Sequence, residues 1–132
     1  MTQFLRVRAD CCQLVIDCLY VQEVGIWNDA SPPAKEALWH DAVLEGASLP
    51  DMLGLPGNQV SATVVLRDPE NEVPAILLGV SEIVGLIDLR EHDFRPVLDG
   101  NISRAIARTA VFNPDLGTVL LKLEVAALLH HQ

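Results

Sequence analysis

The sequence predicts an all-β fold with a minor helical component, arranged as two small barrels on one plan. Short apolar segments alternate with turn-forming residues along most of the chain, a pattern typical of barrels and sandwiches. Helical spacing and capping occur only briefly, once in mid-chain and once at the C-terminal end. A Val-x-Glu-apolar motif follows a predicted hairpin twice, at Val21–Val24 and at Val80–Ile83, which indicates two similar halves.

The first half begins with a predicted hairpin. Apolar and polar residues alternate in Phe4–Ala9, as expected of a strand with one solvent-exposed face. Asp10–Cys12 predicts a turn, and Gln13–Asp17 predicts the returning strand. Asparagine, aspartate, serine and two prolines then predict a loop within Ile26–Lys35.

The second half repeats this order. Val60–Leu66 predicts a strand, Asp68–Glu72 a polar turn, and Val73–Leu78 the partner strand. Two later strands are predicted at Ile106–Phe112 and Thr118–Leu123, separated by a turn that contains proline.

Two short helices complete the prediction. Ser48-Leu49-Pro50-Asp51 has the form of a capped helix start with proline in the first turn, and glycine and proline at positions 54 and 56 end it. The second helix starts at about Glu124, with apolar residues at helical spacing. The side chains expected to be largely buried are Leu5, Val7, Leu14, Ile16, Val64, Leu66, Leu77, Val119 and Leu121.

Length and charge limit the classes of function. The 132 residues fit one domain, residues 1–132, and no apolar run reaches the roughly 18 residues that span a bilayer. The N-terminal residues contain arginines and lack the apolar core of a signal peptide, so we expect a cytoplasmic protein. A formal net charge of -9 argues against nucleic acid and anionic membrane as partners.

The sequence contains no recognisable catalytic motif. It has no G-x-S-x-G nucleophile turn, no phosphate-binding glycine loop and no H-E-x-x-H. Asp17, Glu23 and Asp88 could act as paired carboxylates only if the fold brought them together. We therefore expect no enzymatic activity and no cofactor.

The cysteines and histidines do not predict a metal site. Cys11, Cys12 and Cys18 have no C-x-x-C spacing and are odd in number. The histidines are scattered, and two of them end the chain: His40, His92, His130 and His131. We expect the cysteines to fill a strand and its turn as small side chains.

Several segments together resemble the CheW-like family, the chemotaxis coupling proteins. Val21-Gln22-Glu23-Val24, after an apolar strand, resembles the signature region of the family. The other matching segments, in the same order as in the family, are Leu53–Pro56, Val80–Ile83, Phe94–Val97, Thr118–Leu123 and the helix Glu124–Leu129.

The resemblance implies a fold and a function. The fold is two intertwined five-stranded SH3-like barrels around one shared core, with a C-terminal helix. The function is that of a non-catalytic adaptor, which couples chemoreceptor tips to the regulatory domain of a CheA-type histidine kinase or to other CheW-like proteins in homo- or hetero-oligomers.

The resemblance also implies a partner-binding surface. Its candidate residues are Leu19, Val21, Gln22, Glu23, Val24, Trp39 and His40. In this interpretation Gln22 and Glu23 lie in an exposed turn and face solvent or partner, while Val21 and Val24 hold the turn against the core. Reversing the charge of Glu23 is then expected to weaken binding and to leave stability nearly unchanged.

The sequence departs from the family at three places. Leu38-Trp39-His40-Asp41 stands where the family has Asn-Leu-Arg-Gly, Glu45 stands at a proline position, and the turn Asp10–Cys12 lacks glycine. Because an imidazole does not replace an always-charged guanidinium, the first change weakens the prediction of a chemoreceptor partner.

Two alternative functions remain open. The chain could be a CheW-like interaction module with a partner outside chemotaxis, for which its acidity favours a basic or mixed-charge target. It could also be a small-molecule or thiol-redox sensor that uses Cys11, Cys12 and Cys18.

Overall fold

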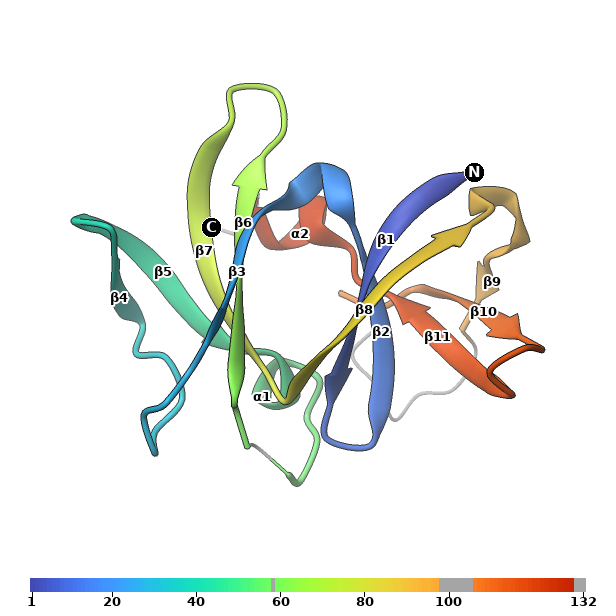
Figure 1. Ribbon diagram of the computed structural model, residues 1–132, viewed down its shortest axis with the longest axis horizontal. Helices are drawn as coiled ribbons and strands as arrows, with labels where there is room; N and C mark the ends of the chain where they lie inside the picture. Colours follow the sequence, from blue (N-terminus) through green and yellow to red (C-terminus); the bar gives the residue numbers. More distant parts are fainter. Residues whose placement is uncertain (58, 98–105, 130–132) are drawn as a thin grey trace.

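Two β-sheets form the framework of the computed structural model, which describes residues 1–57, 59–97 and 106–129 (Figure 1). The six-stranded sheet has the order β8-β1-β2-β11-β10-β9 and consists of β1 (Thr2–Ala9), β2 (Cys12–Asp17), β8 (Glu82–Leu89), β9 (Arg95–Pro96), β10 (Thr109–Asn113) and β11 (Thr118–Lys122). The five-stranded sheet has the order β3-β6-β7-β5-β4 and consists of β3 (Val21–Ile26), β4 (Glu36–Trp39), β5 (Ala42–Ser48), β6 (Ala62–Asp68) and β7 (Val73–Val80). The all-β prediction is confirmed, with the two-residue β9 as an added strand.

The two sheets share one topology, and each combines a hairpin from one half of the chain, β1–β2 or β6–β7, with strands from the other half. The β1–β2 hairpin is followed by β3, which crosses to the other sheet and pairs with β6. The β6–β7 hairpin is followed by β8, which crosses back and pairs with β1 (Figure 1). The β4–β5 hairpin then joins the five-stranded sheet, where β5 pairs in parallel with β7. In the same way the β10–β11 hairpin joins the six-stranded sheet, where β11 pairs in parallel with β2. This exchange confirms the prediction of intertwined halves.

The repeated motif marks these two crossings. Val21–Val24 lies within β3, and Val80–Ile83 joins the end of β7 to the start of β8. The prediction that Val21–Val24 is a turn is wrong, because its backbone pairs with β6, with Val21 opposite Leu66 and Glu23 opposite Val65. Apart from Val21, which is partly buried, the residues of β3 are exposed.

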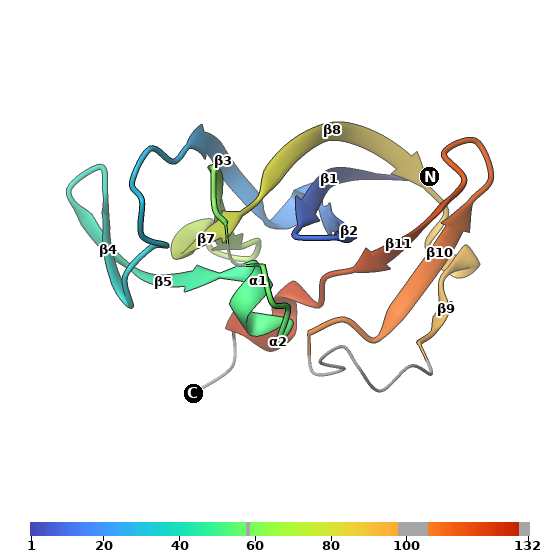
Figure 2. The ribbon, with the colours of Figure 1, turned by 90° about the horizontal axis from the view of Figure 1, so that it is seen from below.

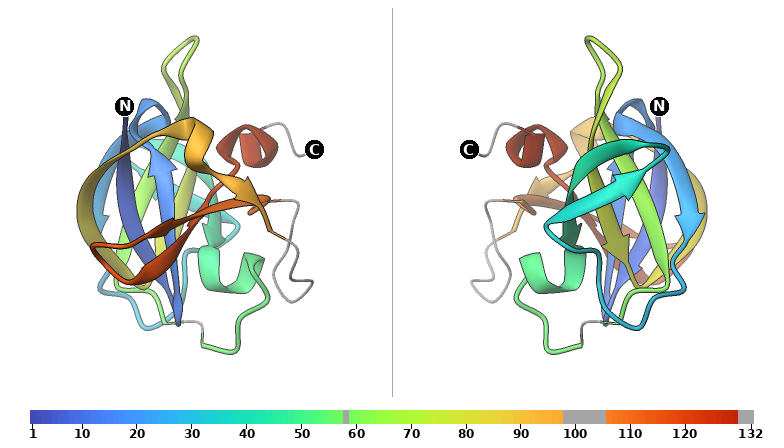
Figure 3. Two further views of the ribbon diagram at one scale, coloured as in Figure 1. Left: turned by 90° about the vertical axis from the view of Figure 1, so that its right-hand side faces the viewer. Right: turned by 90° about the vertical axis from the view of Figure 1, so that its left-hand side faces the viewer.

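The main hydrophobic core lies between the two sheets. Its fully buried side chains include Leu14 and Ile16 from β2, Leu66 from β6 and Leu78 from β7. The helices α1 (Leu49–Met52) and α2 (Val125–Leu129) add Leu49, Val125 and Leu128 to this core. Both helices lie on the opposite side of the molecule from β8 (Figures 2 and 3).

One of the predicted core residues is exposed. Val119 has 52% of its surface accessible, whereas the next residue, Leu120, is fully buried. Leu120 packs against Phe4 and Val15 on one face of β11, while Leu121 joins the main core on the other face. Val119 lies nearer the β10–β11 turn, opposite the exposed Phe112, and extends beyond the core. The other predicted core residues are buried.

The helix predicted to start at Ser48 is present, but the predicted side-chain cap is not formed. Ser48 is the N-cap residue of α1, but its side chain makes no capping hydrogen bond. Its hydroxyl is buried and has no hydrogen-bond partner among the described residues. Helix α1 is one turn long, with Pro50 in that turn, so few free N–H groups need a capping oxygen.

Candidate functional site

The candidate site is built on β3, an edge strand of the five-stranded sheet. The pairing of β3 with β6 shifts between Val21 and Glu23. Glu23 then stands opposite Val65, whose buried side chain belongs to a small cluster with Leu44 and Leu77. Glu23 itself is exposed, so its carboxylate lies at the solvent end of this face of the sheet.

The β4–β5 hairpin brings two further candidate residues to Glu23. Trp39 pairs with Ala42, and the two residues between them, His40 and Asp41, have φ angles of 43° and 66°. Positive φ at both central positions is the geometry of a type I′ turn. The tight turn places the Trp39 and His40 rings 4.6 Å apart in an edge-on arrangement.

Glu23, Trp39 and His40 form one hydrogen-bonded group. Trp39 Nε1 donates to Glu23 Oε2 over 2.7 Å. His40 Nε2 lies 3.3 Å from the same oxygen and 3.5 Å from Oε1. Because β3 and β4 are the opposite edges of the sheet, this group links the two edges and closes the curled sheet at one point.

Arg67 forms hydrogen bonds with two other candidate residues, Gln22 and Leu19. Its Nη1 donates to Gln22 Oε1 over 3.3 Å, and its Nε donates to the backbone carbonyl of Leu19 over 3.2 Å. Asp17 accepts a hydrogen bond from the backbone N–H of Leu19 over 3.0 Å, which caps the short turn Cys18–Tyr20. The sequence analysis did not identify Arg67, and no motif in the sequence singles it out.

The apolar candidates differ in exposure. Val21 is partly buried against the main core, as expected. Val24 is 46% exposed, so the expectation that it holds this segment against the core is wrong. Leu19 and Ile26 are 57% and 82% exposed, and the sequence analysis missed Ile26 because it lay in the predicted loop. Val24 and Ile26 on β3, with Leu19 in the turn that precedes it, are the exposed apolar residues of this segment, and we call them the β3 surface.

Both ends of the molecule also expose apolar pairs. Leu38 and Val43 stand opposite each other on β4 and β5, and are 74% and 68% exposed. Phe112 and Val119 stand opposite each other on β10 and β11 at the other end (Figure 1).

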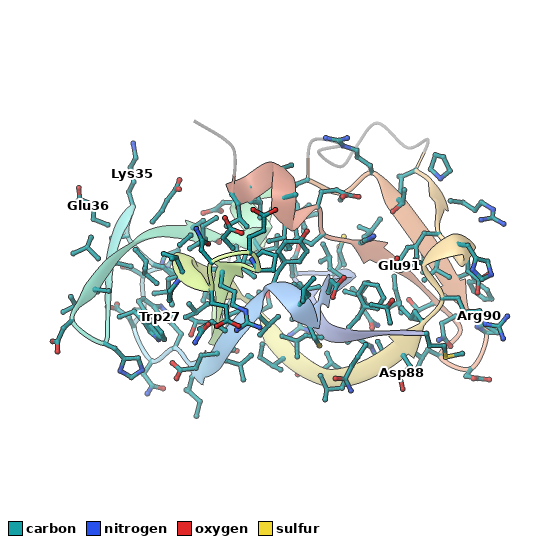
Figure 4. The ribbon with its side chains drawn as sticks, turned by 90° about the horizontal axis from the view of Figure 1, so that it is seen from above. Trp27, Lys35, Glu36, Asp88, Arg90 and Glu91 are labelled. Atoms are coloured by element: carbon teal, nitrogen blue, oxygen red, sulfur yellow. The ribbon has the colours of Figure 1, made fainter. Side chains whose placement is uncertain are left out.

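Charged residues accompany both ends. Lys35 and Glu36 lie at the start of β4, and Asp88, Arg90 and Glu91 lie at the end of β8 (Figure 4). Each end therefore combines an exposed apolar pair with nearby charges of both signs.

The cysteines do not form one cluster. Cys11 and Cys12 lie at the β1–β2 turn, whereas Cys18 follows the other end of β2, a six-residue strand of roughly 20 Å. Burial is the main cause that raises the pKa of Cys12 to about 11, with added contributions from Cys11 and Asp10. Burial also raises the pKa of Cys18, followed by the negative charges of Asp17 and Asp88.

The remaining predictions concern carboxylates and metals. Asp17 and Asp88 both lie near Cys18, but Glu23 is on the other sheet, so the three carboxylates do not meet. Among the described residues, no group of three or more histidine, cysteine, aspartate or glutamate side chains could hold a metal ion. His130 and His131 lie outside the described residues.

Comparison with known proteins identifies the fold. No protein-family model matches the sequence, and no curated protein matches it. Among solved structures, the scaffolding protein TtCheW from Thermoanaerobacter tengcongensis is similar, with a TM-score of 0.76 at 12% sequence identity. The match covers 94% of this chain and 84% of that chain. The chain therefore has the CheW-like fold. None of its described helices has the length and apolar character needed to cross a membrane.

Proposed function

We propose that this protein is a non-catalytic cytoplasmic adaptor in chemotaxis-type signal transduction, which binds the regulatory domain of a CheA-type histidine kinase or other CheW-like domains. The observation that carries the proposal is the CheW-like fold across nearly the whole chain. The similar protein from Thermoanaerobacter tengcongensis is described as a scaffolding protein, and scaffolds act through docking surfaces.

The β3 surface is the docking surface that we propose. Val24 and Ile26 on β3, and Leu19 in the turn before it, expose apolar area, and desolvated apolar side chains supply most of the affinity at protein interfaces. Gln22 and Glu23 add polar groups beside this apolar area.

The β4–β5 turn argues for the kinase or a CheW-like domain over the chemoreceptor tip. His40 stands where the family has arginine, and its ring is directed at the Glu23 carboxylate of the same chain. Trp39 is likewise engaged with Glu23. This turn therefore offers no free guanidinium, whereas the apolar contacts along β3 remain available.

The proposal is tested by calorimetric titration of the protein against the regulatory domain of the CheA-type kinase from the same organism. We expect saturable binding in the micromolar range, and a loss of at least tenfold in affinity for Val24→Ser or Leu19→Ser, each of which removes an apolar contact. Titration against a helical chemoreceptor-tip fragment should give binding at least tenfold weaker.

Val73→Ser is the matched control, because Val73 is 52% exposed on β7 of the same sheet, outside the β3 surface. It should bind the kinase domain as the unchanged protein does, and thermal melts should show all three variants folded. No binding to either the kinase domain or a CheW-like domain from the same organism would refute the proposed function. Binding that Val24→Ser and Leu19→Ser leave unchanged would refute the β3 surface.

A further inference from the structure

An open cavity lies in the six-stranded sheet, away from the β3 surface. Its volume is ≈ 650 Å³, within the range of small-molecule sites. Its walls are mostly apolar and include Val97, Val111, Phe112, Val119 and Leu121. Val119 and Phe112, two of the exposed apolar residues described above, are thus wall residues of this cavity.

Two adjacent thiols also line this cavity. Cys11 and Cys12 are neighbours at the β1–β2 turn, and both contribute to its wall. Ala9 pairs with Cys12, so Asp10 and Cys11 form the two-residue turn, with Asp10 at a φ of 52°. The hairpin thereby holds the two cysteines at a fixed place on the edge of an apolar space. Cys18 does not line the cavity.

The protonation state of Cys12 determines which reactions of its thiol are favoured near neutral pH. Burial, Cys11 and Asp10 raise the pKa of Cys12 to about 11, so little thiolate is present near neutral pH. Oxidation and alkylation require the thiolate. Ligand exchange at a trivalent arsenic oxide consumes neutral thiols overall, because their protons leave with the departing oxygen as water.

We propose that the cavity binds a small ligand with a soft, thiophilic centre and an apolar substituent, of the class of trivalent organoarsenicals. Cys11 and Cys12 together hold the arsenic, and the apolar substituent lies against the cavity wall. For an oxide R–As=O, two S–H bonds and the As=O bond break, two As–S bonds form, and one water leaves. Arsenic stays trivalent, and nothing is oxidised or reduced.

Phenylarsine oxide is the probe, titrated against the full chain in the presence of a competing monothiol. Intact-mass analysis should show one phenylarsenic group per chain, with the loss of two free thiols. We expect Cys11→Ser and Cys12→Ser to weaken binding by about 100-fold, because each removes one of two linked bonds. Cys18→Ser is the matched control and should stay within about twofold of the unchanged protein.

The cavity is tested separately from the thiols. Arsenite, which has no apolar substituent, should bind about tenfold more weakly than phenylarsine oxide, because it buries no phenyl group. Val119→Ser should weaken phenylarsine oxide several-fold and leave arsenite binding unchanged. Val119 is exposed, so the variant is expected to fold, and a thermal melt checks this. Equal affinity for both arsenicals, or equal effects of all three cysteine variants, would overturn the proposal.

Discussion

The indole N–H of Trp39 donates to a carboxylate oxygen of Glu23 over 2.7 Å, and this contact joins strands at opposite edges of the five-stranded sheet. Three strands lie between β3 and β4 in the hydrogen-bonded order. The side-chain contact therefore closes the sheet where no backbone pairing does so. Glu23 thus has a structural role, whatever its role in partner binding.

The first prediction follows from this contact. Glu23→Arg should lower the free energy of unfolding by about 1–2 kcal/mol, because it removes an ionised acceptor and places a cation beside the indole N–H and His40. This loss of stability is at the lower end of the range for hydrogen bonds to a charged group, because the Glu23 side chain is 47% exposed. This expectation differs from the one drawn from the sequence, in which Glu23→Arg leaves the stability nearly unchanged.

Urea denaturation measures this effect. Glu23→Gln keeps an oxygen acceptor and should lose less stability than Glu23→Arg. Glu70→Arg, at an exposed glutamate in the turn after β6, is the charge-matched control and should stay within about 0.5 kcal/mol of the unchanged protein. Equal stability of Glu23→Arg and Glu70→Arg would mean that the Trp39 contact contributes nothing.

The second prediction contrasts a core residue with an exposed one. Leu14→Ala should cost about 2–5 kcal/mol, because Leu14 is fully buried between the sheets. Val119→Ala should cost less than about 0.5 kcal/mol, since Val119 is half exposed. Chemical denaturation of the two variants checks this order. A large loss for Val119→Ala would place that side chain in a packed environment.

The third prediction contrasts two buried serines. The Ser81 hydroxyl accepts from the backbone N–H of Asp10 and donates to the carbonyl of Gln59, both over 2.9 Å. Ser81→Ala should therefore cost about 1–3 kcal/mol, because it leaves a partly buried donor and acceptor without their partner. Ser48→Ala should be neutral or stabilising, because the Ser48 hydroxyl is buried without a partner in the described part of the chain.

Thermal or urea denaturation of these two variants gives the comparison directly. The substitution is the same at both positions, so side-chain volume and helix or strand propensity differ little between them. If Ser48→Ala loses as much stability as Ser81→Ala, the two hydrogen bonds of the Ser81 hydroxyl contribute no stability of their own.

The fourth prediction concerns pH. The pKa of Cys12 is raised from 9.0 to about 11 in the folded protein, mainly by burial. The unfolded chain therefore releases this proton first as pH rises. The stabilising contribution is fully present below pH 9 and is lost between pH 9 and 11.

Two measurements check the pH prediction. Urea denaturation from pH 8 to 11 should show the unchanged protein losing stability relative to Cys12→Ser above pH 9, since serine does not titrate in this range. Alkylation by iodoacetamide, followed by peptide mass mapping, should show the rate at Cys12 still rising above pH 9. A rate at Cys12 that is constant above pH 9 would contradict a raised pKa.

Local patterns predicted most of the regular structure. Alternation in residues 4–9 and the turn at Asp10–Cys12 predicted the first hairpin, and Val60–Leu66 with Val73–Leu78 predicted the second. Local patterns did not predict strands β4, β5, β8 and β9, although exposed and less exposed residues alternate in β8. Gly85, with a φ of 152°, interrupts its side-chain pattern at a shift in the pairing with β1.

The candidate site was only partly predictable. The sequence grouped Glu23 with Trp39 and His40 through a family resemblance, and the structure places the three side chains in contact. It could not predict Arg67, which reaches Leu19 and Gln22 across 48 and 45 positions of the chain. Whether this surface binds a partner stays a prediction.

By itself the sequence determined the class of the fold, the position of both main hairpins and the identity of most core residues. These depend on period-two alternation and turn chemistry, which act over a few neighbouring residues. The tertiary structure alone decided that β3 and β8 exchange between sheets, that Leu120 is buried in place of Val119, and that Glu23 bonds to Trp39. Each depends on which distant strands meet, and this follows from the burial of the whole core, which no short segment of sequence encodes.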